Sequence, residues 1–150
     1  MLVIGIDPGI ATTGYGLVRE TAEGLAALDF GVITTPAGMP MPARLQLLYR
    51  QLGDLLRDHR PDSAAVEKLF FQRNVSTAMA VGQARGVALL ALADAGLDVG
   101  EYTPMEVKQA ISGYGGADKR QMQLMIQAIL GLPELPRPDD AADALAVAVC

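Results

Sequence analysis

The spacing of hydrophobic residues predicts three adjacent strands at the start of the chain. Residues 2–6 form an uninterrupted apolar run that stops at Asp7-Pro8-Gly9, which is typical of a buried central strand ended by a turn. Residues 14–19 and 26–35 also have the composition of strands, and the polar residues 20–24 join them. Because short connections favour antiparallel pairing, we expect a three-stranded meander.

Beyond the meander, the pattern predicts helices that alternate with strands. Leucines at positions 45, 48, 52, 55 and 56 recur at helical spacing, which predicts an amphipathic helix over 40–60. The remaining expected elements are a strand over 64–66 that ends at Glu67, a helix over 75–94 with Asn74 as N-cap, a strand over 97–102, and helices over 105–112, 118–130 and 138–149. This order predicts an α/β fold, a single domain over 1–150 with a mixed five-stranded sheet and helices on both faces.

Composition narrows the class of protein. Apolar residues make up 51% of 150 residues, which excludes a disordered or fibrous chain. No apolar run reaches the roughly 18 residues needed to span a bilayer, and the first ten residues lack the basic segment of a secretory signal. The single cysteine, Cys150, suits a reducing compartment. We therefore expect a cytoplasmic protein without membrane association. Because the chain stops inside an apolar helix, we also expect a short polar tail after Cys150.

Four acidic residues stand at the ends of predicted elements. Asp7 ends the first strand and Glu67 the fourth, whereas Asp140 and Asp143 open the last helix and share one of its faces. If the first and fourth strands are parallel neighbours, Asp7 and Glu67 emerge at the same edge of the sheet. Clustered carboxylates repel one another unless a cation balances them, and oxygen ligands select hard ions such as Mg²⁺ or Mn²⁺. Two such ions could activate water and stabilise the leaving oxygen in phosphodiester hydrolysis.

Each carboxylate also has a structural interpretation. Asp7 could be a turn residue before Pro8, Glu67 a surface acid at a strand end, and Asp139 with Asp140 an N-cap pair favoured by the helix dipole. Asp143 is harder to explain in this way, because it stands between alanines on an otherwise apolar helix. The predicted convergence of all four favours the metal site.

The net charge of −5 is at first sight unfavourable for a nucleic-acid-binding protein. Without the four candidate ligands, however, 13 acidic residues face 12 basic ones. The stretches 68–93 and 119–133 contain basic residues and no acid. Such stretches are equally compatible with a DNA-binding surface and with an ordinary solvated face.

Several blocks of the sequence together resemble one family. They are Gly5–Gly9 with Thr13–Gly16, Val66-Glu67 with Phe70 and Asn74, Gly82–Ala88, Val107–Gln109, and Asp140–Ala146. In this order and spacing, over nearly the whole chain, they resemble the RuvC family of bacterial Holliday-junction resolvases, which have a ribonuclease-H-like fold. The opening block alone is shared with actin-like ATPases and other ribonuclease-H-like proteins, whereas the whole set is specific.

The resemblance implies an activity and a site. The family's catalytic tetrad falls on Asp7, Glu67, Asp140 and Asp143, and some members have histidine where this chain has Asp140. The implied protein is a crossover junction endodeoxyribonuclease that holds two Mg²⁺ ions per site, with Mn²⁺ as a substitute. It would resolve four-way DNA junctions by paired symmetric nicks in recombination and repair. The implied partners are junction DNA, a second copy of the chain in a homodimer, and the RuvA and RuvB branch-migration complex.

The resemblance also implies residues that bind DNA. Phe70 is expected to stack on an unpaired base at the branch point, although it could instead pack beneath its loop. Lys108 and Lys119 match family positions implicated in phosphate contact, although by sequence alone they are ordinary exposed lysines. Arg73 and Arg85 are weaker candidates for phosphate contact.

The helix over 75–94 carries Ala78, Gly82 and Gly86 on one stripe. Each glycine inside a helix lowers its stability by about 1 kcal/mol relative to alanine. We therefore expect these glycines to allow another surface to approach the helix backbone closely. The approaching surface could be the chain's own sheet or, as the resemblance implies, the partner in a homodimer.

Three other functions compete with the nuclease. An RNA-processing nuclease of the same superfamily would share the opening motif but not the block over 82–88. Half of an actin-like ATPase is disfavoured because such enzymes enclose a nucleotide between two domains. A junction-binding protein with an inactive site is disfavoured by the intact tetrad.

Overall fold

The sheet combines two kinds of strand pairing that follow from the lengths of the connections. In the computed structural model, which describes residues 1–68 and 75–150, β1 (Leu2–Asp7), β2 (Thr12–Thr21) and β3 (Gly24–Thr34) form an antiparallel meander. β4 (Ser63–Glu67) pairs parallel with β1, and β5 (Val99–Tyr102) pairs parallel with β4. The strand order β3-β2-β1-β4-β5 places β1 in the middle, as its continuous apolar run predicted.

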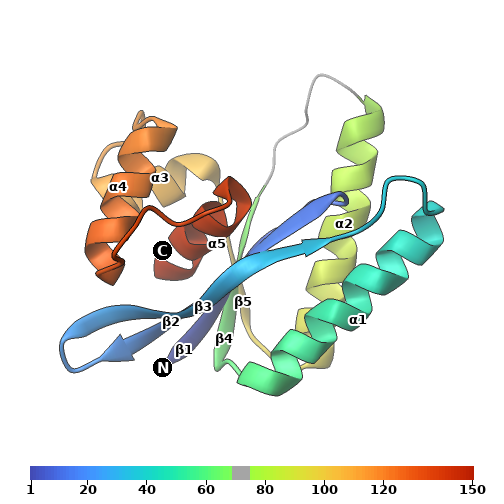
Figure 1. Ribbon diagram of the computed structural model, residues 1–150, viewed down its shortest axis with the longest axis horizontal. Coiled ribbons are helices and arrows are strands. Elements are labelled where there is room, and N and C mark those ends of the chain that lie inside the picture. The colour runs from blue at the N-terminus through green and yellow to red at the C-terminus, as the bar shows by residue number, and fades with distance from the viewer. Residues whose placement is uncertain (69–74) are drawn as a thin grey trace.

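Within the described residues, five helices cover both faces of the sheet (Figure 1). α1 (Met41–His59) and α2 (Val75–Asp94) lie on one face. α3 (Pro104–Ser112), α4 (Lys119–Leu130) and α5 (Asp139–Val149) lie on the other. The expected element types and order are confirmed, with bounds within two residues of the expected ones. Asn74, the expected N-cap of α2, lies outside the described residues.

β1 divides its side chains between the two hydrophobic cores. Leu2, Ile4 and Ile6 are buried and belong to the core under α1 and α2, whereas Val3 packs on the opposite side, under α3, α4 and α5. This alternation is the period of two that an extended strand imposes. Each fully buried aliphatic side chain contributes about 1.5–3 kcal/mol to the free energy of unfolding, so β1 anchors both layers.

Glycines on β1 and β2 let α5 lie directly on the sheet. A Cβ atom added to Gly5 would overlap the carbonyl oxygen of Ala144, and one added to Gly14 would overlap the carbonyl oxygen of Asp140. Gly14 is also the register partner of Asp7 across β1 and β2. The close approach of helix and sheet therefore brings the start of α5 next to the end of β1.

No helix within residues 1–68 and 75–150 is both long enough and apolar enough to cross a lipid bilayer.

Candidate active site

Three carboxylates meet where the sheet and α5 touch. Asp7 is the last residue of β1, and Asp140 and Asp143 lie in the first two turns of α5. One carboxylate oxygen from each of the three lies within 4.8 Å of those of the other two. An arrangement of three oxygen donors at this separation suits a hard divalent cation such as Mg²⁺.

Glu67 stands beside this cluster, outside the group of three. It ends β4, one residue beyond the point where Val66 pairs with Ile6 of β1, so it emerges at the same edge of the sheet as Asp7. It lines a cleft of about 240 Å³ together with Asp143. The cleft opens between the end of β4 and helices α3, α4 and α5.

Burial and neighbouring charges disfavour the ionised forms of Asp7, Glu67 and Asp143. Burial, reinforced by the charges of Asp143, Glu67 and Asp140, raises the pKa of Asp7 from 3.8 to about 8. Burial and the charge of Asp143 raise the pKa of Glu67 from 4.5 to about 7. Burial also raises the pKa of Asp143. A bound cation would reverse this penalty, because it favours the ionised form of every one of these groups.

Two lysines bring positive charge to the cleft. Lys108 of α3 and Lys119, the first residue of α4, both line it, and their charges lower the pKa of Glu67 against the larger effect of burial. The ammonium nitrogen of Lys119 lies 3.3 Å from a carboxylate oxygen of Asp139. Both lysines therefore face the acidic cluster and stay partly open to solvent, as phosphate-binding side chains would.

Local capping sets where the lysine-bearing helices begin. Thr103 and Glu106 form a reciprocal capping box at the start of α3. Asp118 and Gln121 form another at the start of α4, which places Lys119 at the first helical position. Pro138 occupies the N-cap position of α5, where no side chain makes a capping hydrogen bond. The interpretation of Asp139 and Asp140 as an N-cap pair is therefore not supported.

Two hydrogen bonds of one buried hydroxyl group fix the turn that follows Asp7. Thr13 is fully buried, and its Oγ1 donates to the carbonyl oxygen of Gly9 at 2.5 Å and accepts from the amide of Gly9 at 3.2 Å. Two bonds from one side chain close the loop between β1 and β2. The position of Asp7 is thus supported by the strand before it and by this loop after it.

Comparison with known proteins adds independent evidence. The family model described as crossover junction endodeoxyribonuclease RuvC matches residues 3–150. The chain belongs to the RuvC family. A relative with the same description from Chloroflexus aurantiacus is 61% identical over 150 residues, which is 100% of this chain and 92% of the relative. The prediction from the sequence motifs is confirmed.

Solved structures of the family have the same fold. The RuvC structure from Thermus thermophilus matches with a TM-score of 0.91 at 41% identity, covering 99% of this chain and 92% of that one. A second structure, described as T. thermophilus RuvC in complex with Holliday junction substrate, matches with a TM-score of 0.90 at 39% identity, covering 99% and 91%. The predicted ribonuclease-H-like architecture is confirmed.

Two of the residues predicted to bind DNA, Phe70 and Arg73, lie outside the described part of this RuvC-family chain. The other arginine candidate, Arg85, has partners within the protein. Its guanidinium donates to the carbonyl oxygen of Glu67 at 2.6 Å and pairs with the carboxylate of Glu101. Sequence reasoning missed this contact because an arginine in a helix has the same pattern whether it faces DNA or a neighbouring strand.

Sequence reasoning also missed a second groove that reaches the site. This groove is lined by Arg120 of α4 and by residues at and just before the start of α5, among them Arg137, Asp139 and Asp140. Arg137 stands between two prolines just before α5, a place where the local pattern shows only a loop. Basic side chains therefore flank Asp140 as well as Glu67.

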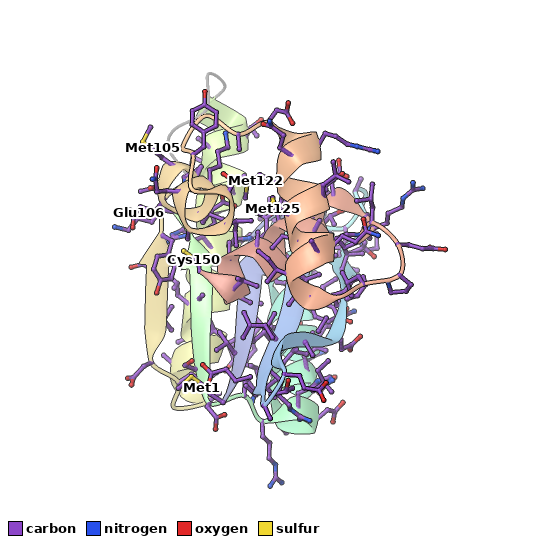
Figure 2. All side chains as sticks on the ribbon, turned by 90° about the vertical axis from the view of Figure 1, so that its left-hand side faces the viewer. Met1, Met105, Glu106, Met122, Met125 and Cys150 are labelled. Carbon is purple, nitrogen blue, oxygen red and sulfur yellow. The ribbon has the colours of Figure 1, made fainter. Side chains whose placement is uncertain are left out.

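Cys150 takes no part in this chemistry. It follows the last turn of α5, near Glu106 of α3 (Figure 2). The carboxylates lie in the first two turns of the same helix. Burial, with a contribution from the charge of Glu106, raises the pKa of its thiol. A thiol that stays protonated is a poor nucleophile and a poor metal ligand.

Proposed function

We propose that this protein is a structure-selective endonuclease that resolves four-way (Holliday) DNA junctions by paired symmetric nicks, in recombination and repair. The observation that carries the proposal is the convergence of Asp7, Asp140 and Asp143 beside Glu67 in a chain of the RuvC family. The related T. thermophilus protein in complex with Holliday junction substrate supports four-way DNA as the ligand.

The four carboxylates would hold two Mg²⁺ ions, which Mn²⁺ would replace. When bound, such a pair activates water and stabilises the leaving oxygen of a phosphodiester. Because burial raises the pKa values of Asp7 and Glu67 to about 8 and about 7, both side chains would release protons on loading. Lys108 and Lys119 would contact the phosphate oxygens and orient the scissile bond over the cluster.

Residues outside the described structure complete the proposed DNA contacts. By family resemblance, Phe70 stacks on an unpaired base at the branch point and Arg73 contacts a phosphate. Phosphate contacts would supply most of the affinity, whereas stacking would open the junction near the bond to be cut.

The exposed face of α2 supports the proposed homodimer. Added Cβ atoms at Gly82 and Gly86 would meet nothing within 4 Å, so these glycines do not serve close packing on the chain's own sheet. Met79 and Leu90 on the same face are 61% and 54% exposed. Together with Ala78 they form a stripe of small and apolar residues that suits another copy of α2. A twofold axis would then present one tetrad to each of two equivalent DNA strands.

The remaining parts of the proposal rest on family resemblance alone. They are action in the cytoplasm and association with the RuvA and RuvB branch-migration complex.

Substrate choice tests the proposed activity. The wild-type protein and Asp7→Asn are incubated with a synthetic four-way junction, linear duplex DNA, precursor RNA and ATP, with and without Mn²⁺. We expect metal-dependent nicks in the junction by the wild type, and binding without nicks by the variant. Cleavage of RNA alone would indicate an RNA-processing nuclease, and binding without cleavage by the wild type would indicate a structural protein. Nicking by Asp7→Asn at the wild-type rate would exclude Asp7 as a ligand.

Mixed dimers test the pairing of the nicks. Dimers of one wild-type and one Asp7→Asn chain are given a supercoiled plasmid with an extruded cruciform. We expect nicked circles from mixed dimers and linear plasmid from wild-type dimers, because relaxation after one nick reabsorbs the cruciform. Equal amounts of linear product would reject one tetrad per strand. A monomer in sedimentation, both free and on the junction, would reject the dimer.

A further inference from the structure

The carbonyl group at the end of β4 lacks a partner in the sheet. The amide of Ala64 donates to the carbonyl oxygen of Asp98, the residue before β5, at 3.0 Å, and the amide of Lys68 donates to that of Tyr102 on β5 at 2.7 Å. The alternation of a strand therefore turns the carbonyl of Glu67 toward β1. There the residue after Asp7 is Pro8, which has no N–H to donate. A main-chain acceptor is thus left open at the residue that carries one of the candidate ligands.

Arg85 supplies the missing donor. Its Nη1 donates to the carbonyl oxygen of Glu67 at 2.6 Å, while its Nη2 pairs with the carboxylate of Glu101 on β5. The arginine side chain is 18% exposed. Ala84 and Ala88 on either side of it are fully buried and hold this part of α2 in the core. The rigid guanidinium therefore links α2 to the ends of two neighbouring strands.

We propose that Arg85 is a positioning residue for Glu67, and that it sets where the Glu67 carboxylate stands relative to Asp7 and Asp143. The inference rests on the proposed function, because it assigns Glu67 to a metal site. It differs from a role for Arg85 in DNA binding, since the arginine side chain is only 18% exposed and two of its nitrogens bind groups of the protein itself. The same constraint holds with or without DNA, so its effect is on metal binding and not on junction affinity.

Two substitutions separate the geometry of the contact from its charge. Arg85→Lys keeps the positive charge but loses the planar fork, so one ammonium cannot reach both acceptors in the same way. Glu101→Gln is the matched control, because it keeps an acceptor for Arg85 and leaves the bond to Glu67 in place. Loss of groups that orient metal ligands typically costs about 10–100-fold in metal affinity or activity.

The primary measurement is Mn²⁺ binding to the DNA-free protein by calorimetry. We expect Arg85→Lys to raise the dissociation constant for Mn²⁺ at least about 10-fold, and Glu101→Gln to raise it by no more than about fivefold, as for a half-exposed ion pair. The Mn²⁺ concentration for half-maximal junction cleavage should shift in parallel. Because metal binding is measured without cleavage, failure of the nuclease proposal leaves this readout intact.

Junction affinity measured over a range of salt concentrations provides the second readout. A positioning role predicts a wild-type dissociation constant and salt dependence for Arg85→Lys and for the uncharged variant Arg85→Gln. A phosphate contact predicts weaker binding by Arg85→Gln and a salt slope reduced by about 0.9. That result, or wild-type Mn²⁺ affinity in Arg85→Lys, would overturn the proposal. If neither Arg85→Lys nor Arg85→Gln shows a folding transition in thermal denaturation, the proposal is overturned and Arg85 has a structural role.

Discussion

Replacing Asp7 with asparagine should stabilise the metal-free protein while it destroys the proposed site. Burial and three neighbouring carboxylates raise the pKa of Asp7 from 3.8 to about 8. A group whose pKa is raised in the folded state binds more protons there than in the unfolded chain. The free energy of unfolding therefore falls as the pH rises from about 4 to about 8. Asparagine does not ionise, so the variant loses this contribution to the pH dependence.

The size of the effect follows from the same shift. Each pH unit between the unfolded and folded pKa values removes about 1.4 kcal/mol from the free energy of unfolding. Between pH 4 and pH 7 the contribution of Asp7 is therefore about 4 kcal/mol. For a domain of this size 1 kcal/mol corresponds to roughly 2–4 °C in Tm. At pH 7 we thus expect metal-free Asp7→Asn to melt about 8–16 °C above the metal-free wild type.

The assay is thermal and urea denaturation in EDTA from pH 4.5 to pH 8. Asp58→Asn is the control, because Asp58 is an exposed acid on α1, which lies on the other face of the sheet from α5. Excess Mn²⁺ should narrow the difference in stability between the two proteins, since a ligand at 100 times its Kd stabilises the folded state by about 2.7 kcal/mol and Asp7→Asn removes part of the site.

Two results would refute this reasoning. One is a metal-free wild type whose stability does not change between pH 5 and pH 8. The other is an Asp7→Asn variant no more stable at pH 7 than Asp58→Asn. Either would mean that the carboxylates of the metal-free protein are solvated and not in mutual repulsion.

Three further predictions concern the elements around the site. Gly14→Ala should destabilise the fold by several kcal/mol in urea denaturation and abolish cleavage, because its Cβ would overlap the carbonyl oxygen of Asp140. The control is Gly53→Ala on α1, where an added Cβ meets nothing within 4 Å and should stabilise the fold by up to about 1 kcal/mol. Gly82→Leu should leave the protomer folded but shift sedimentation toward the monomer, and an unchanged dimer would move the interface away from this face. Lys119→Gln should slow cleavage at least about 10-fold with a smaller loss of junction affinity, and an equal loss of both would assign Lys119 to binding alone.

Much of the fold could be predicted because its elements follow local patterns. The apolar run of β1 and the leucine spacing of α1 have the period of the strand or helix that they form. The turn after β1 is likewise indicated by adjacent residues, Asp7-Pro8-Gly9. The candidate ligands could be named for a related reason. Asp7 and Glu67 end their strands, and parallel neighbours bring such ends to one edge of a sheet.

Other features were decided only by contacts between residues distant in sequence. The local pattern does not reveal what the glycines of β1 and β2 pack against, yet they set how closely α5 approaches the sheet and hence how near Asp140 comes to Asp7. Gly82 and Gly86 fit two surfaces equally well by pattern, and the fold turns them away from their own sheet.

The contacts of Arg85 could not be predicted from the sequence. Its place in a helix and its charge allow a contact with DNA, with solvent or with another strand, because a long cationic side chain suits all three. Only the packing of α2 against the ends of β4 and β5 selects the carbonyl of Glu67 and the carboxylate of Glu101. Periodicity, composition and strand ends thus determined the elements and the chemistry available to this protein. The tertiary structure decided which groups meet, because the distances between them depend on packing across the whole chain.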